Sequence, residues 1–251
     1  MKKTVWIKRT VVVLLSAVYA VSAWQVSKIL HEEKKAEDCY EDFQNLVVMD
    51  HPPEKSTSAE DEPSERVPVS IDLAPLQEQY PDVIGWLYCE GTEINYPVAQ
   101  GKNNSQYLRH LLDGTYNTAG TLFADYRNKE KNGHLLIYGH NMKNGTMFGS
   151  LVQYKKQEYY DEHPVLYYFT SDKVYKVELI AGYVTSSSSD AYRLDFGTEE
   201  SVGTHISEAL KKSTFHSNVS YTEGDRLMTL STCSYEYSNA RYVVVGLMKE
   251  L

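Results

Sequence analysis

The sequence predicts a mainly β domain with flanking helices, arranged as a barrel or a sandwich and preceded by a membrane-anchor helix. Many short apolar runs separated by turn residues predict the strands. One uncharged apolar run near the N-terminus, with basic residues before it, predicts the anchor. We divide the 251 residues into an anchor region (1–30), a charged spacer (31–68) and a globular domain (69–251).

The apolar run is Thr10–Trp24, and it follows Lys2, Lys3, Lys8 and Arg9. Positive residues stay on the cytoplasmic side of a membrane, so the rest of the chain is expected outside the cell. A signal peptide cleaved near Val21–Ala23 remains an alternative. Further apolar residues on both sides of the run favour an uncleaved, single-pass signal-anchor.

The spacer carries an excess of acidic residues. His31–Val48 contains helix formers and charge pairs, and it predicts a helix that leads away from the membrane. Asp50–Pro68 combines prolines and acids with almost no apolar residue, which predicts a flexible linker. The net charge of −9 lacks the basic face that nucleic-acid binding requires, so we exclude that class of function.

In the globular part, apolar runs bounded by turn signals predict strands at Ile84–Tyr88, Ile94–Val98, Leu135–Tyr138, Leu166–Thr170, Val174–Val184, Arg226–Leu230 and Tyr242–Met248. Helices are expected at Ser105–Leu111, Met147–Tyr154 and Thr198–Ser213. The third begins with Thr198 as a capping residue.

Three cysteines lie far apart in the sequence, at Cys39, Cys89 and Cys233. An odd number without a Cys-x-x-Cys pair indicates neither a disulfide framework nor a zinc knuckle. At least one thiol therefore stays unpaired outside the cell. Cys89 lies in an apolar run and is expected to be a buried, inert thiol, and Cys39 is not expected to be catalytic.

Three segments place a reactive residue at the edge of a predicted strand: Thr229–Cys233, Leu136–Asn141 and Asn239–Gly246. A cysteine attacks as its thiolate and needs a base to do so near neutral pH. His140 titrates in that range, and Arg241 can hydrogen-bond an oxyanion while staying charged. Together, these residue types suffice for acyl transfer through a thioester.

Residue chemistry alone leaves alternatives open. A cysteine at a strand end is usually a small packed residue, and His134 and His163 compete with His140 for the catalytic role. A metal site made of His134, His140 and Cys233 is also conceivable, although its spacing is irregular. A membrane-tethered binding module without catalysis would bury Cys233 away from His140 and Arg241.

Ordered blocks of sequence resemble class B sortases, the cysteine transpeptidases of Gram-positive cell surfaces. Thr229–Cys233 resembles the TLxTC motif, and an arginine follows at short range. The other blocks are Asp82–Val98, Tyr107–Leu108, Asp113–Arg127 and His134–Gly149. The resemblance implies an eight-stranded β-barrel with flanking helices. It also implies that Cys233, His140 and Arg241 are the catalytic residues.

The resemblance further implies that Cys233 cleaves a C-terminal sorting motif of NPxTx or PxTG type after its threonine. An amine of peptidoglycan, or a lysine of a pilin, would then resolve the thioester. Sorting-signal-bearing surface proteins would be the partners, and no cofactor or metal is expected. A purely hydrolytic cysteine peptidase remains an alternative. The residues expected to bind the peptide are Ser231, Thr232, Tyr138, Leu108, Asn104 and Tyr192. Ser234 follows the cysteine where some relatives carry an acid.

Overall fold

A computed structural model describes residues 2–47, 49–50, 67–129 and 133–251. The strands are β1 (Met49–Asp50), β2 (Ser70–Ile71), β3 (Val83–Tyr88), β4 (Asn95–Ala99), β5 (Leu122–Ala124), β6 (His134–Tyr138), β7 (Val165–Phe169), β8 (Val174–Ser186), β9 (Arg226–Cys233) and β10 (Ala240–Glu250). The α-helices are α1 (Lys2–Leu46), α2 (Ala74–Gln79), α3 (Gln157–Glu162) and α4 (Glu199–Lys212), and the 3₁₀ helices are η1 (Gly149–Lys155) and η2 (Asp190–Tyr192).

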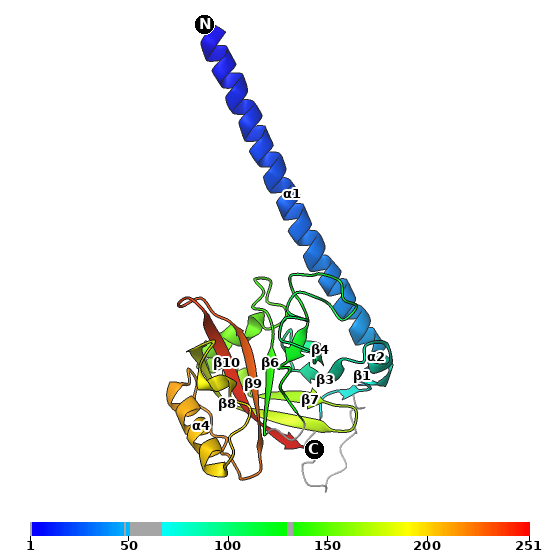
Figure 1. Ribbon diagram of the computed structural model, residues 1–251, viewed down its shortest axis with the longest axis vertical. Helices are drawn as coiled ribbons and strands as arrows, with labels where there is room; N and C mark the ends of the chain where they lie inside the picture. Colours follow the sequence, from blue (N-terminus) through cyan, green and yellow to red (C-terminus); the bar gives the residue numbers. More distant parts are fainter. Residues whose placement is uncertain (1, 48, 51–66, 130–132) are drawn as a thin grey trace. The chain divides into compact units, whose positions relative to one another are not determined.

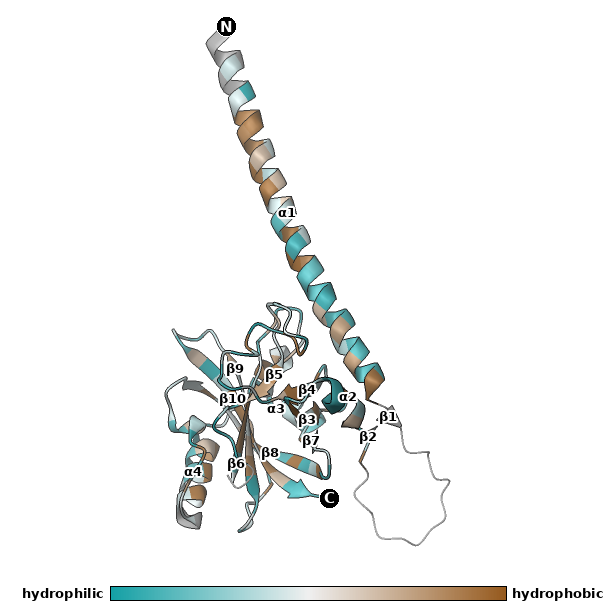
Figure 2. Ribbon diagram, turned by 45° about the vertical axis from the view of Figure 1, so that its right-hand side comes forward, coloured by the Kyte–Doolittle hydropathy of each residue, from teal (hydrophilic) through white to brown (hydrophobic). Residues whose placement is uncertain are grey.

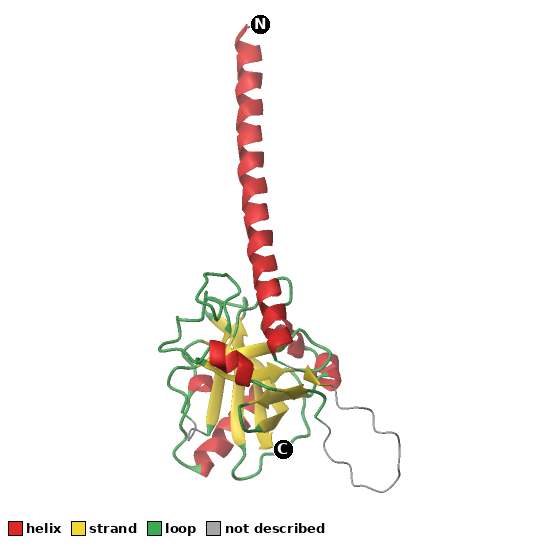
Figure 3. Ribbon diagram, turned by 90° about the vertical axis from the view of Figure 1, so that its right-hand side faces the viewer, coloured by secondary structure: helices red, strands yellow, loops and turns green. Residues whose placement is uncertain are grey.

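Eight of the described strands close into a barrel in the order β10-β8-β7-β3-β4-β5-β6-β9, so the predicted barrel is confirmed (Figure 1). Most neighbours pair antiparallel, but β4 with β5 and β6 with β9 run parallel. The short helices lie outside the barrel (Figure 3). Parallel pairing of β6 and β9 brings the ends of both strands to the same edge of the barrel, which is where Cys233 and His140 lie.

The apolar residues of β10 explain how the barrel is covered. Val243, Val245 and Leu247 pack in one buried cluster with Ile206 and Ala209 of α4. The intervening residues of the strand are buried as well. A strand buried on both faces reads as a continuous apolar run rather than an alternating one, as this one does. α4 therefore covers the outer face of the sheet, and the predicted helix with its Thr198 cap is confirmed.

The helix expected at Ser105–Leu111 is wrong, because this segment forms successive turns instead. Two of its backbone carbonyls bond to groups far along the chain rather than to the next helical turn. The carbonyl of Tyr107 accepts from the Thr121 amide (3.0 Å), and that of Leu108 accepts from the His140 ring (2.6 Å). A helix would consume those acceptors internally.

Several other elements differ from the sequence prediction. The helix expected at Met147–Tyr154 is the 3₁₀ helix η1, which begins after Met147 because that residue has a positive φ of 56°. α2, α3 and β5 were not predicted, since each is too short to show a clear period. The seven predicted strands are all present, with ends shifted by a few residues.

α1 contains the apolar run and the predicted spacer helix as far as Leu46, and the last predicted residue, Val48, lies outside the described residues. Its large apolar side chains from Val11 to Leu30 are exposed, and the helix is long and apolar enough to cross a membrane (Figure 2). Further along, Tyr40, Phe43 and Val47 are buried in the compact unit formed by residues 40–251. The Tyr40 hydroxyl donates to the Gly120 carbonyl. The linker predicted at Asp50–Pro68 lies almost entirely outside the described residues.

Candidate active site

The register of β6 and β9 assembles one wall of the site. Tyr138 lies opposite Ser231 in the parallel ladder. His140 follows Tyr138 by two residues, as Cys233 follows Ser231. The two chains therefore leave the barrel edge together and carry the histidine and the cysteine to one cavity of about 350 Å³. Cys233 is half-buried there, at the last position of β9.

Arg241 comes from the next strand of the same hairpin. It lies directly opposite Cys233 in the antiparallel register of β9 and β10, and it lines the same cavity. Its Nη1 donates to the Ala240 carbonyl at 2.9 Å. The side-chain amide of Asn141, which follows His140, donates to the Cys233 carbonyl at 2.9 Å. The backbone around the cysteine is thus tied to both neighbouring strands.

The His140 ring is oriented by a contact from the turn segment. Its Nε2 lies 2.6 Å from the Leu108 carbonyl. A carbonyl only accepts, so Nε2 carries the proton and Nδ1 is left to exchange one. Burial lowers the pKa of His140 below its ordinary value, and the nearby Arg109 charge adds to that effect against the Leu108 bond. The ring is therefore uncharged near neutral pH.

Gly139 allows the histidine strand to pack this closely. A Cβ at that position would lie 2.4 Å from a Leu122 methyl and 2.7 Å from the Phe148 ring. Its amide donates to the Ser231 carbonyl (3.1 Å), and its carbonyl accepts from the Thr232 hydroxyl (2.9 Å). Any side chain would clash with Leu122 and Phe148, so glycine here is a packing requirement.

All nine predicted site residues line this one cavity. On one side the Tyr192 hydroxyl lies 2.9 Å from the Ser231 hydroxyl, and its ring stacks on Tyr138 with centroids 6.1 Å apart. On the other side, Asn104 and the 40% exposed Leu108 come from the turn segment. The tethered-module alternative, which separates Cys233 from His140 and Arg241, does not match this arrangement.

Sequence reasoning missed further residues of the cavity: Phe123, Asp125, Arg127, Gly139 and Ser187. Asp125 has no exposed side-chain surface and pairs with Arg127 through an Nε–Oδ1 bond of 2.8 Å. The signal was an acid directly after a short apolar run, followed by an arginine two residues later. A buried acid of this kind needs a partner, and the arginine is that partner.

The structure places His134, which competed with His140 for the catalytic role, away from the cavity. His134 is fully buried, with Nδ1 2.5 Å from the Arg193 carbonyl and Nε2 2.7 Å from the Thr229 hydroxyl. Both ring nitrogens of His134 are thus hydrogen-bonded outside the cavity. His134 therefore cannot form a metal site together with His140 and Cys233. The first acid after the cysteine, Glu236, pairs with Lys155 and accepts from the Ser234 hydroxyl.

The chain is similar to proteins of known family. Residues 87–249 match the Sortase domain family. Sortase B of Listeria monocytogenes is 30% identical over 250 residues, which cover 98% of each chain. A Staphylococcus aureus sortase B–substrate complex is 33% identical with a TM-score of 0.67, covering 70% of this chain and 83% of that one. A sortase B complexed with triglycine is 32% identical with a TM-score of 0.67, covering 72% and 88%.

Proposed function

This chain belongs to the sortase B family of transpeptidases, and we propose that its reaction proceeds through a thioester on Cys233. The substrate is a surface protein with a C-terminal sorting motif of NPxTx or PxTG type, cut after the threonine. The observation that carries the proposal is the meeting of Cys233, His140 and Arg241, from three separate strand ends, in one cavity.

The first half-reaction uses all three residues. The Cys233 sulfur attacks the threonine carbonyl carbon, and the thiol proton passes to His140. Arg241 hydrogen-bonds the oxyanion that forms. The carbon–nitrogen bond then breaks, and the imidazolium gives its proton to the leaving amine. The low pKa of His140 favours giving the proton over holding it.

The second half-reaction reverses these roles. An incoming amine attacks the thioester carbon, His140 accepts its proton, and the Cys233 thiolate leaves. A peptidoglycan amine is the acceptor that we propose, which would attach the surface protein to the cell wall. A relative was solved in complex with triglycine, so an N-terminal glycine is the first amine to test. If water resolved the thioester instead, the same residues would make a thiol peptidase.

The proposed location is the outer face of the cell membrane. α1 supplies one helix of sufficient length and apolar character, and Lys2, Lys3, Lys8 and Arg9 precede its apolar part. The positive-inside tendency then puts the N-terminus in the cytoplasm and the barrel outside. There the barrel can meet both exported proteins and wall precursors. The proposed division into anchor (1–30), spacer (31–68) and catalytic domain (69–251) fits this topology.

The test uses the full chain in detergent with quenched peptides that bear either type of motif. Triglycine is added or omitted, and products are read by mass spectrometry. We expect cleavage after the threonine, a triglycine adduct when triglycine is present, and loss of both in Cys233→Ala. Cys89→Ala is the matched control and should retain both. Arg241→Ala should lower kcat about 10²–10³-fold, as loss of an oxyanion donor does.

The outcomes separate the alternatives. Cleavage without an adduct for any of several amines supports the peptidase. An adduct with a lysine side chain of a pilin, but not with triglycine, supports a pilin-polymerising sortase. Cleavage that persists in Cys233→Ala contradicts the thioester on this residue.

A further inference from the structure

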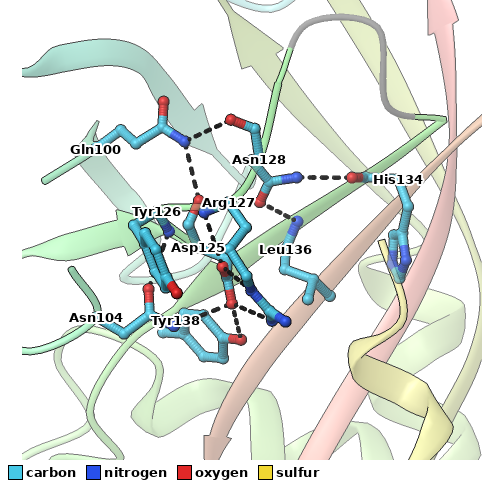
Figure 4. A network of polar contacts seen from close by, with 9 residues as sticks. All are labelled: Gln100, Asn104, Asp125, Tyr126, Arg127, Asn128, His134, Leu136 and Tyr138. Atoms are coloured by element: carbon cyan, nitrogen blue, oxygen red, sulfur yellow. Dashed lines mark hydrogen bonds and ion pairs between the residues drawn. The ribbon is translucent and has the colours of Figure 1, made fainter. Parts of the chain in front are cut away.

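One carboxylate connects three separate parts of the cavity wall (Figure 4). Asp125 directly follows β5 and lines the cavity with its buried side chain. Its Oδ1 accepts from Arg127 Nε (2.8 Å) and from the Arg127 backbone amide (3.0 Å), and its Oδ2 accepts from Arg127 Nη2 (2.9 Å). The fork of the guanidinium thereby fixes the orientation of both carboxylate oxygens.

The same carboxylate holds two residues that we assigned to peptide binding. Oδ2 accepts from Asn104 Nδ2 at 3.0 Å and from the Tyr138 hydroxyl at 2.9 Å. Asn104 comes from the turn segment and Tyr138 from β6. The other end of the Asn104 amide is also engaged, since its Oδ1 accepts from the Tyr126 backbone amide at 2.9 Å. Figure 4 shows these contacts converging on Asp125.

The charge on Asp125 decides which hydrogen-bonding groups face the cavity. Burial opposes its ionisation, but hydrogen bonds from Arg127, Asn104 and Tyr138 lower the pKa of Asp125 to about 2. An ionised carboxylate only accepts. The Tyr138 proton is therefore committed to Asp125, and burial together with that charge raises the pKa of Tyr138. What remains on the Tyr138 oxygen is acceptor capacity.

From this geometry we infer that Asp125 is a positioning residue for the peptide site. It fixes Tyr138 as a hydrogen-bond acceptor and, by engaging one N–H of the Asn104 amide, orients the second N–H of that amide as a donor to the bound peptide. Through Tyr138, it makes the cavity select an N–H group of the sorting motif, either a backbone amide or a side-chain amide. The inference rests on the proposed function and adds a specificity-determining residue to it.

A neutral side chain at position 125 would no longer hold Tyr138 as an acceptor only. In Asp125→Asn, the new amide nitrogen can donate to the Tyr138 oxygen, so Tyr138 no longer presents an acceptor only. Cys233, His140 and Arg241 make no contact with Asp125 among the bonds of the described residues. The change should therefore weaken peptide binding and leave the chemical steps intact.

The experiment measures KM and kcat of the full chain in detergent with its preferred sorting peptide. Asp125→Asn and Tyr138→Phe should each raise KM about fivefold to tenfold, the size of one hydrogen bond, with kcat changed by less than about twofold. The double variant should show no more than the larger single effect, because both act through one hydroxyl. Arg127→Lys keeps the charge but loses the fork, and should raise KM by a smaller factor.

Glu178→Gln is the matched control. That carboxylate on β8 also pairs with cations, Lys176 and Lys249, but it lies outside the cavity, so KM and kcat should stay as in the wild type.

Folding is checked by circular dichroism, and Arg127→Lys with Tyr138→Phe keeps the test available if Asp125→Asn does not fold. An unchanged KM in the folded variants, or effects that multiply in the double variant, would overturn the inference. A fall in kcat alone would also do so. If the wild type showed no turnover at all, the result would contradict the proposed function itself, and with it the peptide site on which this inference rests.

Discussion

The barrel contains two contrasting pairs of the same residue types. Cys233 and His140 line the open cavity at the edge of the barrel, whereas Cys89 and His134 are fully buried. Cys89 Sγ lies 3.8 Å from the Tyr154 hydroxyl and 3.6 Å from the Val165 carbonyl, and burial raises the pKa of the thiol. Both pairs lie at or beside strand ends, so access to the cavity, rather than residue type or place in a strand, is what separates them.

The largest expected effect comes from replacing Cys233 and Cys89 with alanine, one at a time. Cys233→Ala should lower kcat/KM roughly a thousandfold or more, because it removes the proposed nucleophile. Cys89→Ala should keep kcat/KM within about twofold and instead lower the melting temperature, because it leaves a small cavity in the core. Peptide cleavage and thermal unfolding measure both. Equal loss of activity in the two variants would contradict the proposed difference between Cys233 and Cys89.

The buried histidine should make stability depend on pH. Burial lowers the pKa of His134 to about 4 from 6.5, so between these values the unfolded chain binds a proton that the folded chain does not. The free energy of unfolding should then fall as pH drops from 6.5 to 4, by about 3 kcal/mol from this residue. Above pH 6.5 the contribution is fully present.

Urea unfolding of the wild type and His134→Gln across that pH range measures this contribution. Asp125 does not change stability between pH 6.5 and 4, because it titrates at lower pH. Its contribution to stability is lost only as the pH falls from about 4 toward its pKa of about 2. A His134→Gln variant with the same pH dependence as the wild type would refute the assignment.

The smallest effect concerns the active-site histidine. Burial first, and then the Arg109 charge, lowers the pKa of His140. Arg109→Gln should move this pKa upward, toward the ordinary value, in an NMR titration of the ring. Arg109 is exposed, so about 0.5 M salt should remove most of the difference between variant and wild type. No shift at low salt would mean that burial and hydrogen bonding alone set the pKa.

The sequence predicted the barrel, and the strand ends that carry the cavity-lining Cys233, His140 and Arg241, because both depend on local signals. Strand periodicity places β6, β9 and β10, and a short polar motif ends or begins each of them. What it could not predict depends on distant partners. The segment Ser105–Leu111 has apolar spacing that suits a helix, but its carbonyls bond to residues such as Thr121 and His140.

The role of Asp125 was hidden for the same reason. Its partners Asn104 and Tyr138 lie 21 and 13 residues away along the chain, and they meet it only once the barrel has closed. No spacing rule links such residues. The preference between His140 and His134 likewise needed the family resemblance, because His134 begins β6, His140 follows the same strand, and only the structure shows that His134 is enclosed.

The thioester itself is the central claim, and trapping it is the most direct measurement. The full chain is mixed with its sorting peptide without any amine, quenched in acid, and examined by intact-mass and peptide mass spectrometry. We predict a mass increase equal to the peptide fragment ending in threonine, located on Cys233, released by hydroxylamine and absent from Cys89. An adduct on another residue, or cleavage after threonine that continues in Cys233→Ala, would contradict the account.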